Sequence, residues 1–142
     1  METILLLEDD AANLQGIAGV LRSEHYFVVA ASTGLQAIET TKACGPISLL
    51  VSDMDLPYSS GTEIALTLLA MYPNLPVLFI SGTPMVWWNS RDVSNFQCLP
   101  PNSVDFIEKP FSVAQLLMRV RNLIGRRVQM RTDKENQENQ AA

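Results

Sequence analysis

Five short apolar segments alternate with segments of helical periodicity, and this alternation constrains the fold more than any other feature of the chain. At least three of the segments are apolar nearly throughout, which is typical of strands buried on both faces of a parallel sheet. The alternation therefore predicts an α/β fold, an open doubly wound parallel sheet with helices on both faces. The predicted strands are Ile4–Leu7, Tyr26–Ala31, Ile47–Val51, Val77–Ile80 and Val104–Ile107.

Helix signals fill the intervals between these segments. Three spacings have the form of a capping box, in which two side chains pair with the backbone at a helix N-terminus: Thr33-x-x-Gln36, Ser60-x-x-Glu63 and Ser112-x-x-Gln115. The last helix has the clearest apolar face, which starts at Val113 and ends at Val128. The interval 84–103 lacks such a face and contains two successive prolines, so we expect a fourth helix that is short, shifted or partly loop.

Composition limits the organisation of the chain. A length of 142 residues with 47% hydrophobic content predicts one domain, which we place at residues 1–130. Residues 131–142 are almost entirely polar and are expected to form a frayed helix followed by a disordered tail. Cys44 and Cys98 are far apart in the sequence and lack metal-ligand spacing, so both are expected to be free, buried thiols.

Charge and hydropathy exclude several classes of protein. The formal net charge of -5 has the wrong sign for a surface that binds nucleic acid or anionic lipid over its whole extent. Five arginines near the C-terminus are interpreted as a solvated helix face rather than a nucleic-acid patch. The N-terminus is acidic, and no apolar run approaches the roughly 20 residues that cross a bilayer. We expect a cytoplasmic protein without membrane contact.

Acidic side chains follow two of the predicted strands. Glu8, Asp9 and Asp10 come after the first strand, and Asp53 and Asp55 come after the third. These strands are neighbours in a doubly wound sheet, so the five carboxyl groups are expected to meet in one crevice at the carboxyl edge. Like charges gathered in one crevice repel strongly, and a divalent cation relieves the repulsion. Oxygen ligands without His or Cys favour Mg²⁺.

Two further polar groups are predicted at the same edge. Ser81 ends the fourth strand, and Lys109 follows the fifth. Carboxylates, a metal ion, an ammonium group and a hydroxyl together suit a phosphoryl group in transfer, because the charge of that group needs electrostatic stabilisation.

With these motifs in order, residues 3–128 resemble the receiver domain of two-component response regulators. Four segments carry the resemblance: ILLLEDD (4–10), SDMDLPYSSG (52–61), VLFISG (77–82) and FIEKPF (106–111). Each motif is weak alone, but the four occur in order at the ends of successive strands. The resemblance implies a flavodoxin-like, five-stranded sheet with strand order 2-1-3-4-5.

The resemblance also implies a role for each site residue. Asp53 is similar to the phosphoacceptor of the family, with Pro57 and Gly61 at the family's spacing after it. The remaining roles are these: Glu8 and Asp9 as the metal-binding acidic pair, Asp53 as a further metal ligand, the backbone carbonyl of Asp55 as another, Lys109 as the lysine that pairs with the phosphoryl group, Ser81 as the switching hydroxyl and Phe106 as the switching aromatic.

The implied function is that of a phosphoprotein in a phosphorelay. A sensor histidine kinase or a histidine phosphotransfer protein would donate the phosphoryl group to Asp53 in the presence of Mg²⁺. The chain would then catalyse only its own phosphorylation and dephosphorylation, so it would not be an enzyme in the usual sense. Phosphorylation would alter the surface formed by the fourth helix, fifth strand and last helix, which would contact a downstream protein or a second copy. With no effector domain after the last helix, the chain is expected to act alone.

The sequence is also compatible with two alternative functions. One is a receiver-like binding module that is never phosphorylated and docks a partner through Trp87 and Trp88, at least one of which is expected to be accessible. The other is a phosphatase of the haloacid dehalogenase type, in which Asp53 and Asp55 would be the nucleophile and the acid/base. The interval from Ser81 to Phe106 is longer than the family pattern, and we expect it to be the mobile, partner-binding part.

Overall fold

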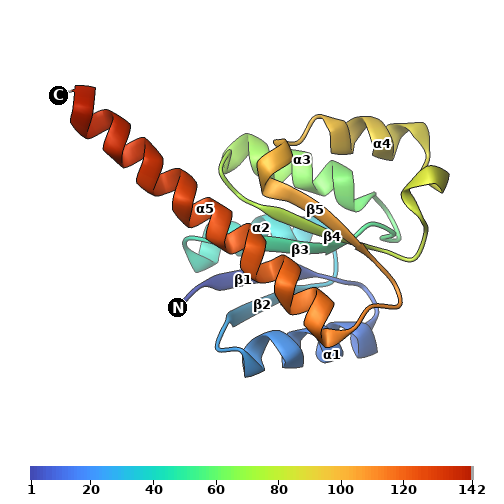
Figure 1. The fold of residues 1–142 in the computed structure, drawn as a ribbon. Coiled ribbons are helices and arrows are strands. Elements are labelled where there is room, and N and C mark those ends of the chain that lie inside the picture. The colour runs from blue at the N-terminus through green and yellow to red at the C-terminus, as the bar shows by residue number, and fades with distance from the viewer. Residues whose placement is uncertain (142) are drawn as a thin grey trace.

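The structure is a computed structural model that describes residues 1–141, and it contains a five-stranded parallel sheet with strand order β2-β1-β3-β4-β5 (Figure 1). The strands are β1 (Thr3–Leu7), β2 (Phe27–Ala31), β3 (Leu49–Asp53), β4 (Val77–Ser81) and β5 (Val104–Glu108). The predicted α/β class, the strand order and the parallel pairing are confirmed. The third strand lies two residues further along the chain than predicted.

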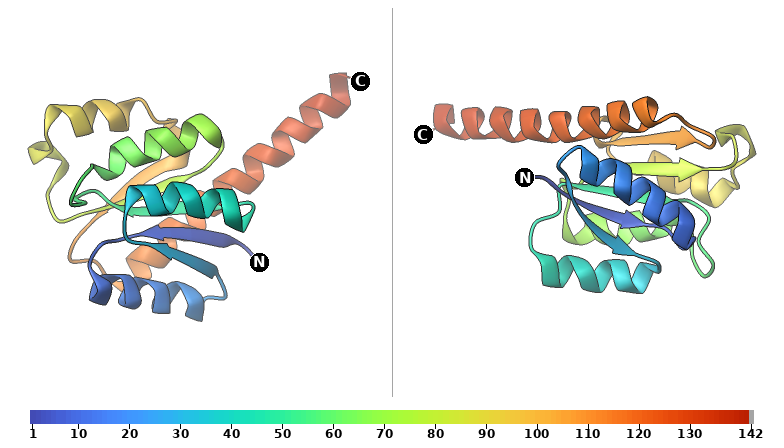
Figure 2. Two further views of the ribbon diagram at one scale, coloured as in Figure 1. Left: turned by 180° about the vertical axis from the view of Figure 1, so that it is seen from behind. Right: turned by 90° about the horizontal axis from the view of Figure 1, so that it is seen from below.

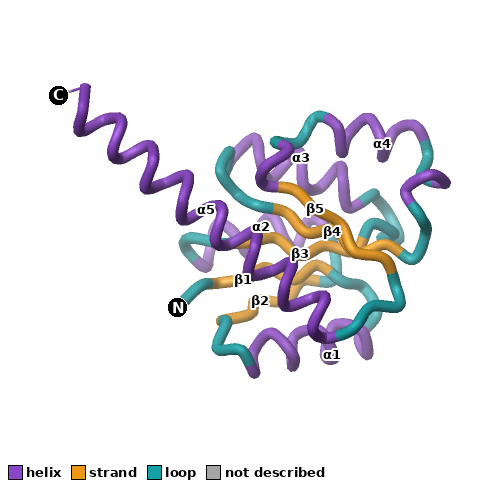
Figure 3. Tube along the Cα trace, viewed as in Figure 1, coloured by secondary structure: helices purple, strands orange, loops and turns teal. Residues whose placement is uncertain are grey.

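Helices cover both faces of the sheet (Figures 2 and 3). They are α1 (Ala11–Ser23), α2 (Gly34–Cys44), α3 (Gly61–Met71), α4 (Ser90–Gln97) and α5 (Val113–Ala141), with short 3₁₀ turns η1 (Met85–Trp87) and η2 (Pro101–Ser103). One core cluster joins the sheet to α1 and α5, and a second joins it to α2, α3 and α4. Each strand is therefore covered on both sides.

The two core clusters explain why β1 is apolar at nearly every position. Successive side chains of a strand point to opposite faces. Ile4 and Leu6 belong to the cluster with α1 and α5, whereas Leu5 and Leu7 belong to the cluster on the other face. All four side chains are fully buried, so none of these positions tolerates a polar residue without loss of packing.

The predicted capping boxes differ in how fully they form. At the start of α5, the N–H of Gln115 donates to Ser112 Oγ and the N–H of Ser112 donates to Gln115 Oε1, so this box is reciprocal. At the start of α3, Ser60 caps the helix as predicted, but Glu63 forms an ion pair with Arg91 at 3.0 Å. A side chain at the third helical position is thus available for tertiary pairing when a cation lies nearby.

The irregular interval between β4 and β5 has the expected form. It contains η1, a short α4 that Asn89 caps, and η2. Pro101 begins η2, where the fixed φ of proline is compatible with a first helical position. A short, shifted fourth helix flanked by loop is therefore confirmed.

The C-terminal segment and the cysteines depart from the expectations. The structure continues α5 as a helix through Ala141, where a disordered tail was expected, and Ala142 lies outside the described residues. Residues 126–141 contain no Gly or Pro to end the helix, and α5 runs past the edge of the sheet (Figure 1). Cys44 and Cys98 are free as expected but exposed rather than buried, because both lie at helix C-termini away from the core.

Candidate functional site

Strand register brings the predicted site residues to one edge of the sheet. Leu7 of β1 pairs with Ser52 of β3, so the next residues along these strands, Glu8 and Asp53, are neighbours. On the other side, Ser81 at the end of β4 pairs with Glu108 of β5, and Lys109 comes directly afterwards. The prediction that these residues gather at the carboxyl edge follows from parallel pairing and is confirmed.

Asp53 is the centre of this arrangement. Its side chain is buried, with 6% of the residue exposed. Oδ1 accepts the backbone N–H of Asp55 at 3.1 Å, and Oδ2 lies 3.4 Å from Lys109 Nζ. The two contacts fix the plane of the carboxylate, since each holds a different oxygen. Asp53 therefore presents a positioned, negatively charged oxygen beside a cation.

Glu8 lies beside Asp53 and is almost completely buried. Its Oε1 accepts the backbone N–H of Asp10 at 3.2 Å, whereas its Oε2 is buried with no hydrogen-bond partner within the described chain. Burial raises the pKa of Glu8 to about 7, repulsion from Asp53 adds to the rise, and the Asp10 N–H opposes it. A buried carboxylate oxygen without a donor is a position that a cation satisfies.

Of the five predicted carboxyl groups, three form a compact cluster. Oxygens of Glu8, Asp9 and Asp53 all lie within 4.8 Å of one another. Asp10 does not join them, because its Oδ1 accepts the N–H of Asn13 and caps α1. The expectation that all five converge is therefore wrong for Asp10, whose side chain pairs with the helix N-terminus that follows it.

Asp55 lies at the exposed rim, in the loop between β3 and α3. Partial withdrawal from water raises the pKa of its carboxyl group, and repulsion from Asp53 and Asp92 adds to the rise. This loop returns to the sheet at Gly61, whose N–H donates to the carbonyl of Met54 at 3.0 Å. A Cβ at Gly61 would collide with the backbone oxygen of Asp53, so the close approach requires glycine.

Ser81 and Phe106 occupy defined positions near the cluster. Ser81 is buried, and its Oγ donates to the carbonyl of Thr83 at 2.8 Å while accepting the Thr83 N–H at 3.0 Å. The hydroxyl is thus directed to the loop after β4. Phe106 in β5 is half-buried on the α4 side of the sheet, where it contacts Trp88 and Phe96.

The two tryptophans differ sharply in environment, in accordance with the expectation that one is accessible. Trp87 in η1 is 75% exposed. Trp88 is half-buried, packs against the core cluster of α2, α3 and α4, and donates from Nε1 to the carbonyl of Thr83 at 2.9 Å. The pair is therefore one surface residue and one anchoring residue.

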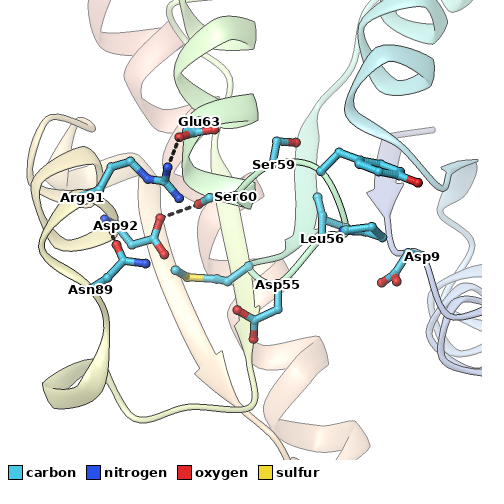
Figure 4. Close-up of a pocket in the computed structure, with 12 residues that line it drawn as sticks. Asp9, Asp55, Leu56, Ser59, Ser60, Glu63, Asn89, Arg91 and Asp92 are labelled. Carbon is cyan, nitrogen blue, oxygen red and sulfur yellow. Dashed lines mark hydrogen bonds and ion pairs between the residues drawn. The ribbon is translucent and has the colours of Figure 1, made fainter.

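A polar cleft of about 480 Å³ is lined by Asp9, by the loop from β3 to α3 and by the start of α4 (Figure 4). Asp92 of α4 is buried in its wall and accepts the hydroxyl of Ser60 at 2.5 Å and that of Thr62 at 2.8 Å. These bonds join α4 to the start of α3. Sequence reasoning missed Asp92. Its position three residues after Asn89 is typical of a helix start, but its burial depends on the contact between α4 and α3, which leaves no local signal in the sequence.

Comparison with known protein families agrees with this geometry. A family model described as "Response regulator receiver domain" matches residues 4–121. Among curated proteins, the chain is 31% identical over 125 residues to the transcriptional regulatory protein CreB of Escherichia coli, covering 88% of this chain and 52% of CreB. It is 31% identical over 123 residues to hybrid signal transduction histidine kinase D of Dictyostelium discoideum, covering 85% of this chain and 8% of that protein. The chain thus spans about half of CreB and a small part of the kinase.

Solved structures agree as well. A response regulator receiver protein from Sinorhizobium medicae is 32% identical with a TM-score of 0.76, and the match covers 89% of this chain and 96% of that one. A CheY-like receiver domain protein from Methanospirillum hungatei shares the fold, with a TM-score of 0.79 at 21% identity over 92% of this chain and 98% of that one. From the family match, these relatives and the acidic cluster at the sheet edge, we conclude that the chain belongs to the response regulator receiver domain family of two-component signalling systems.

Proposed function

We propose that this receiver domain, residues 1–130, accepts a phosphoryl group on Asp53 from a phosphohistidine of a sensor histidine kinase or a histidine phosphotransfer protein. The observation that carries the proposal is the orientation of the buried Asp53 carboxylate between the Asp55 N–H and Lys109 Nζ. In the transfer, an Asp53 oxygen attacks phosphorus and the phosphorus–nitrogen bond breaks. The electron pair stays on the imidazole nitrogen. Lys109 offsets charge on the transferring group.

Mg²⁺ fits the acidic cluster. We propose that the carboxylates of Glu8, Asp9 and Asp53, with the backbone carbonyl of Asp55, hold this ion. The unpartnered Oε2 of Glu8 and the three clustered carboxylates support the assignment, since all-oxygen ligands suit a hard divalent cation. When bound, Mg²⁺ supplies positive charge to the phosphoryl oxygens.

The switching step that we propose uses Ser81 and Phe106. The Ser81 hydroxyl would leave Thr83 and donate to a phosphoryl oxygen on Asp53, and Phe106 would move further inward on the α4 side of the sheet. Two observations support this step. Phe106 is half-buried, and Ser81 ends β4 at the carboxyl edge of the sheet, where Asp53 also lies. The α4-β5-α5 surface would then present a different face to a downstream protein or to a second copy of the chain.

We propose that the phosphodonor approaches Asp53 from the side of α1. An apolar groove beside Lys109 is lined by α1 and by the loop from β5 to α5, including Gly16, Pro110 and Phe111. A helical partner seated there would place a phosphohistidine next to Lys109.

We propose that this encounter occurs in the cytoplasm and that the chain catalyses only its own phosphorylation and dephosphorylation. Residues 131–142 would take no part in the transfer.

The test is phosphorylation by a small phosphodonor with Mg²⁺, read by intact-protein mass. Wild type should gain one phosphoryl group, and Asp53→Asn should gain none. Asp55→Asn is the matched control, because its backbone carbonyl is unchanged, and it should still gain the group. Mass addition that persists in Asp53→Asn would refute the acceptor. Steady phosphate release that Asp55→Asn abolishes would instead support the dehalogenase-type alternative.

A further inference from the structure

The carbonyl oxygen of Thr83 accepts hydrogen bonds from two side chains. Ser81 Oγ donates to it at 2.8 Å, and Trp88 Nε1 donates to it at 2.9 Å. A carbonyl oxygen has two lone pairs, so the two donors satisfy it fully. The residue is half-buried in the loop after β4, where water competes only in part.

The Trp88 indole also contacts the two aromatic residues that border this loop. Its ring centroid lies 5.2 Å from that of Phe106 in β5, at an interplanar angle of 70°. It lies 5.6 Å from that of Phe96 in α4, at 71°. Both arrangements are edge-to-face contacts, which aromatic rings favour. One side chain therefore joins the loop after β4, α4 and β5.

A serine hydroxyl has a single hydrogen to donate. Ser81 therefore cannot donate to the Thr83 carbonyl and to a phosphoryl oxygen on Asp53 at the same time. When Ser81 turns to the phosphoryl group, the Thr83 carbonyl loses one donor and keeps the Trp88 N–H. Without that N–H, the carbonyl would have neither donor, and in a half-buried residue water replaces the lost donors only in part, which is unfavourable.

We propose that Trp88 is a positioning residue for the switch. Its N–H keeps the Thr83 carbonyl paired while the Ser81 hydroxyl moves. Because its ring contacts Phe106, a change in the loop after β4 also changes the packing around Phe106. This inference rests on the proposed function, because it requires Ser81 to respond to a phosphoryl group on Asp53. It assigns to Trp88 a role within the domain, whereas Trp87 is a surface residue with 75% exposure.

The first test measures binding of beryllofluoride with Mg²⁺ by titration calorimetry. Trp88→Phe retains an aromatic ring but lacks the N–H, and we expect binding to be weaker by about fivefold to tenfold. Trp87→Phe is the matched control and should bind like wild type. In a Ser81→Ala background no hydroxyl leaves the carbonyl, so Trp88→Phe should then have little effect. An equal loss in both backgrounds would show a general structural role and would overturn the proposal.

The second test leaves Trp88 in place and reads its environment. In Trp87→Phe, fluorescence comes from Trp88 alone, and saturation with beryllofluoride and Mg²⁺ should change its emission. In Trp88→Phe, emission comes from the exposed Trp87 and should change much less. Saturated binding with unchanged Trp88 emission would contradict the coupling. Absence of beryllofluoride binding to wild type would overturn the proposed function itself, which calorimetry distinguishes from a failure of the Trp88 role alone.

Discussion

Replacing Glu8 with glutamine tests the electrostatics of the acidic cluster. Burial, with repulsion from Asp53, raises the pKa of Glu8 from 4.5 to about 7. Between these values the folded protein binds more protons than the unfolded chain, so the stability that this group contributes is present below about pH 4.5 and is lost as the pH rises through about 7. Each pKa unit corresponds to about 1.4 kcal/mol, so the loss is about 3 kcal/mol.

Glu8→Gln removes this titration and preserves the shape. The amide oxygen retains the bond from the Asp10 N–H, and the amide nitrogen occupies the place of the unpartnered Oε2 beside Asp53. We expect the variant to be more stable than wild type by about 2 to 3 kcal/mol at pH 8 without divalent ions, and the difference to shrink toward zero near pH 4.5. Urea unfolding at the two pH values measures both quantities.

The controls separate this effect from general surface charge. Glu39→Gln replaces an exposed carboxylate on α2 and should leave the free energy of unfolding at pH 8 close to that of wild type. Mg²⁺ should stabilise wild type at pH 8 and should stabilise Glu8→Gln much less, since the proposed ligand is lost. A variant that is less stable than wild type at pH 8, or that keeps the wild-type pH dependence, would refute the reasoning.

Four further outcomes follow from the same contacts. Asp9→Asn should weaken Mg²⁺ binding in a calorimetric titration without lowering metal-free stability, because it relieves repulsion; unchanged affinity would contradict this. Gly61→Ala should lower the free energy of unfolding by about 2 kcal/mol or more, because its Cβ meets the Asp53 backbone; urea unfolding measures the change. Asp92→Ala removes the acceptor that two buried hydroxyls share, so one of them keeps only the other as a partner, and the variant should be destabilised by about 1 to 3 kcal/mol in the same assay. Hydrogen exchange with and without beryllofluoride should change mainly within residues 82–106, and uniform protection would count against a mobile segment there.

The fold and the central site residues were accessible to sequence reasoning because both depend on periodic, local patterns. Buried parallel strands produce apolar runs, and the polar residue that ends each run marks the carboxyl edge. The sequence alone therefore places Glu8, Asp53 and Lys109 together. The bounds of β3 were less accessible, because the apolar run from Ile47 does not reveal which residues pair with β1 and β4.

Other features depend on contacts between elements and leave no pattern in the sequence. Asp92 is buried because the start of α3 offers two hydroxyls to it, and only the packing of α4 on α3 brings them together. The direction of the Ser81 hydroxyl depends on the backbone of Thr83, two residues later. The continuation of α5 depends on local sequence instead of tertiary contacts. Its C-terminal residues contain no Gly or Pro to end the helix, so the helix extends even where no apolar face remains.

Glu8 and Lys109 each have contacts that a ligand of opposite charge would complete. Glu8 has one buried oxygen without a donor, so this part of the cluster lacks positive charge. Lys109 reaches Asp53 at 3.4 Å, which is long for a charge-assisted hydrogen bond, so its ammonium group retains capacity for a further anion. A cation at Glu8 together with a phosphoryl dianion beside Lys109 would complete both sets of contacts at once. We therefore expect the two ligands to bind with positive cooperativity, so beryllofluoride affinity should rise with Mg²⁺ in wild type and should depend less on Mg²⁺ in Glu8→Gln. Independent binding of the two in wild type would contradict this view of the site.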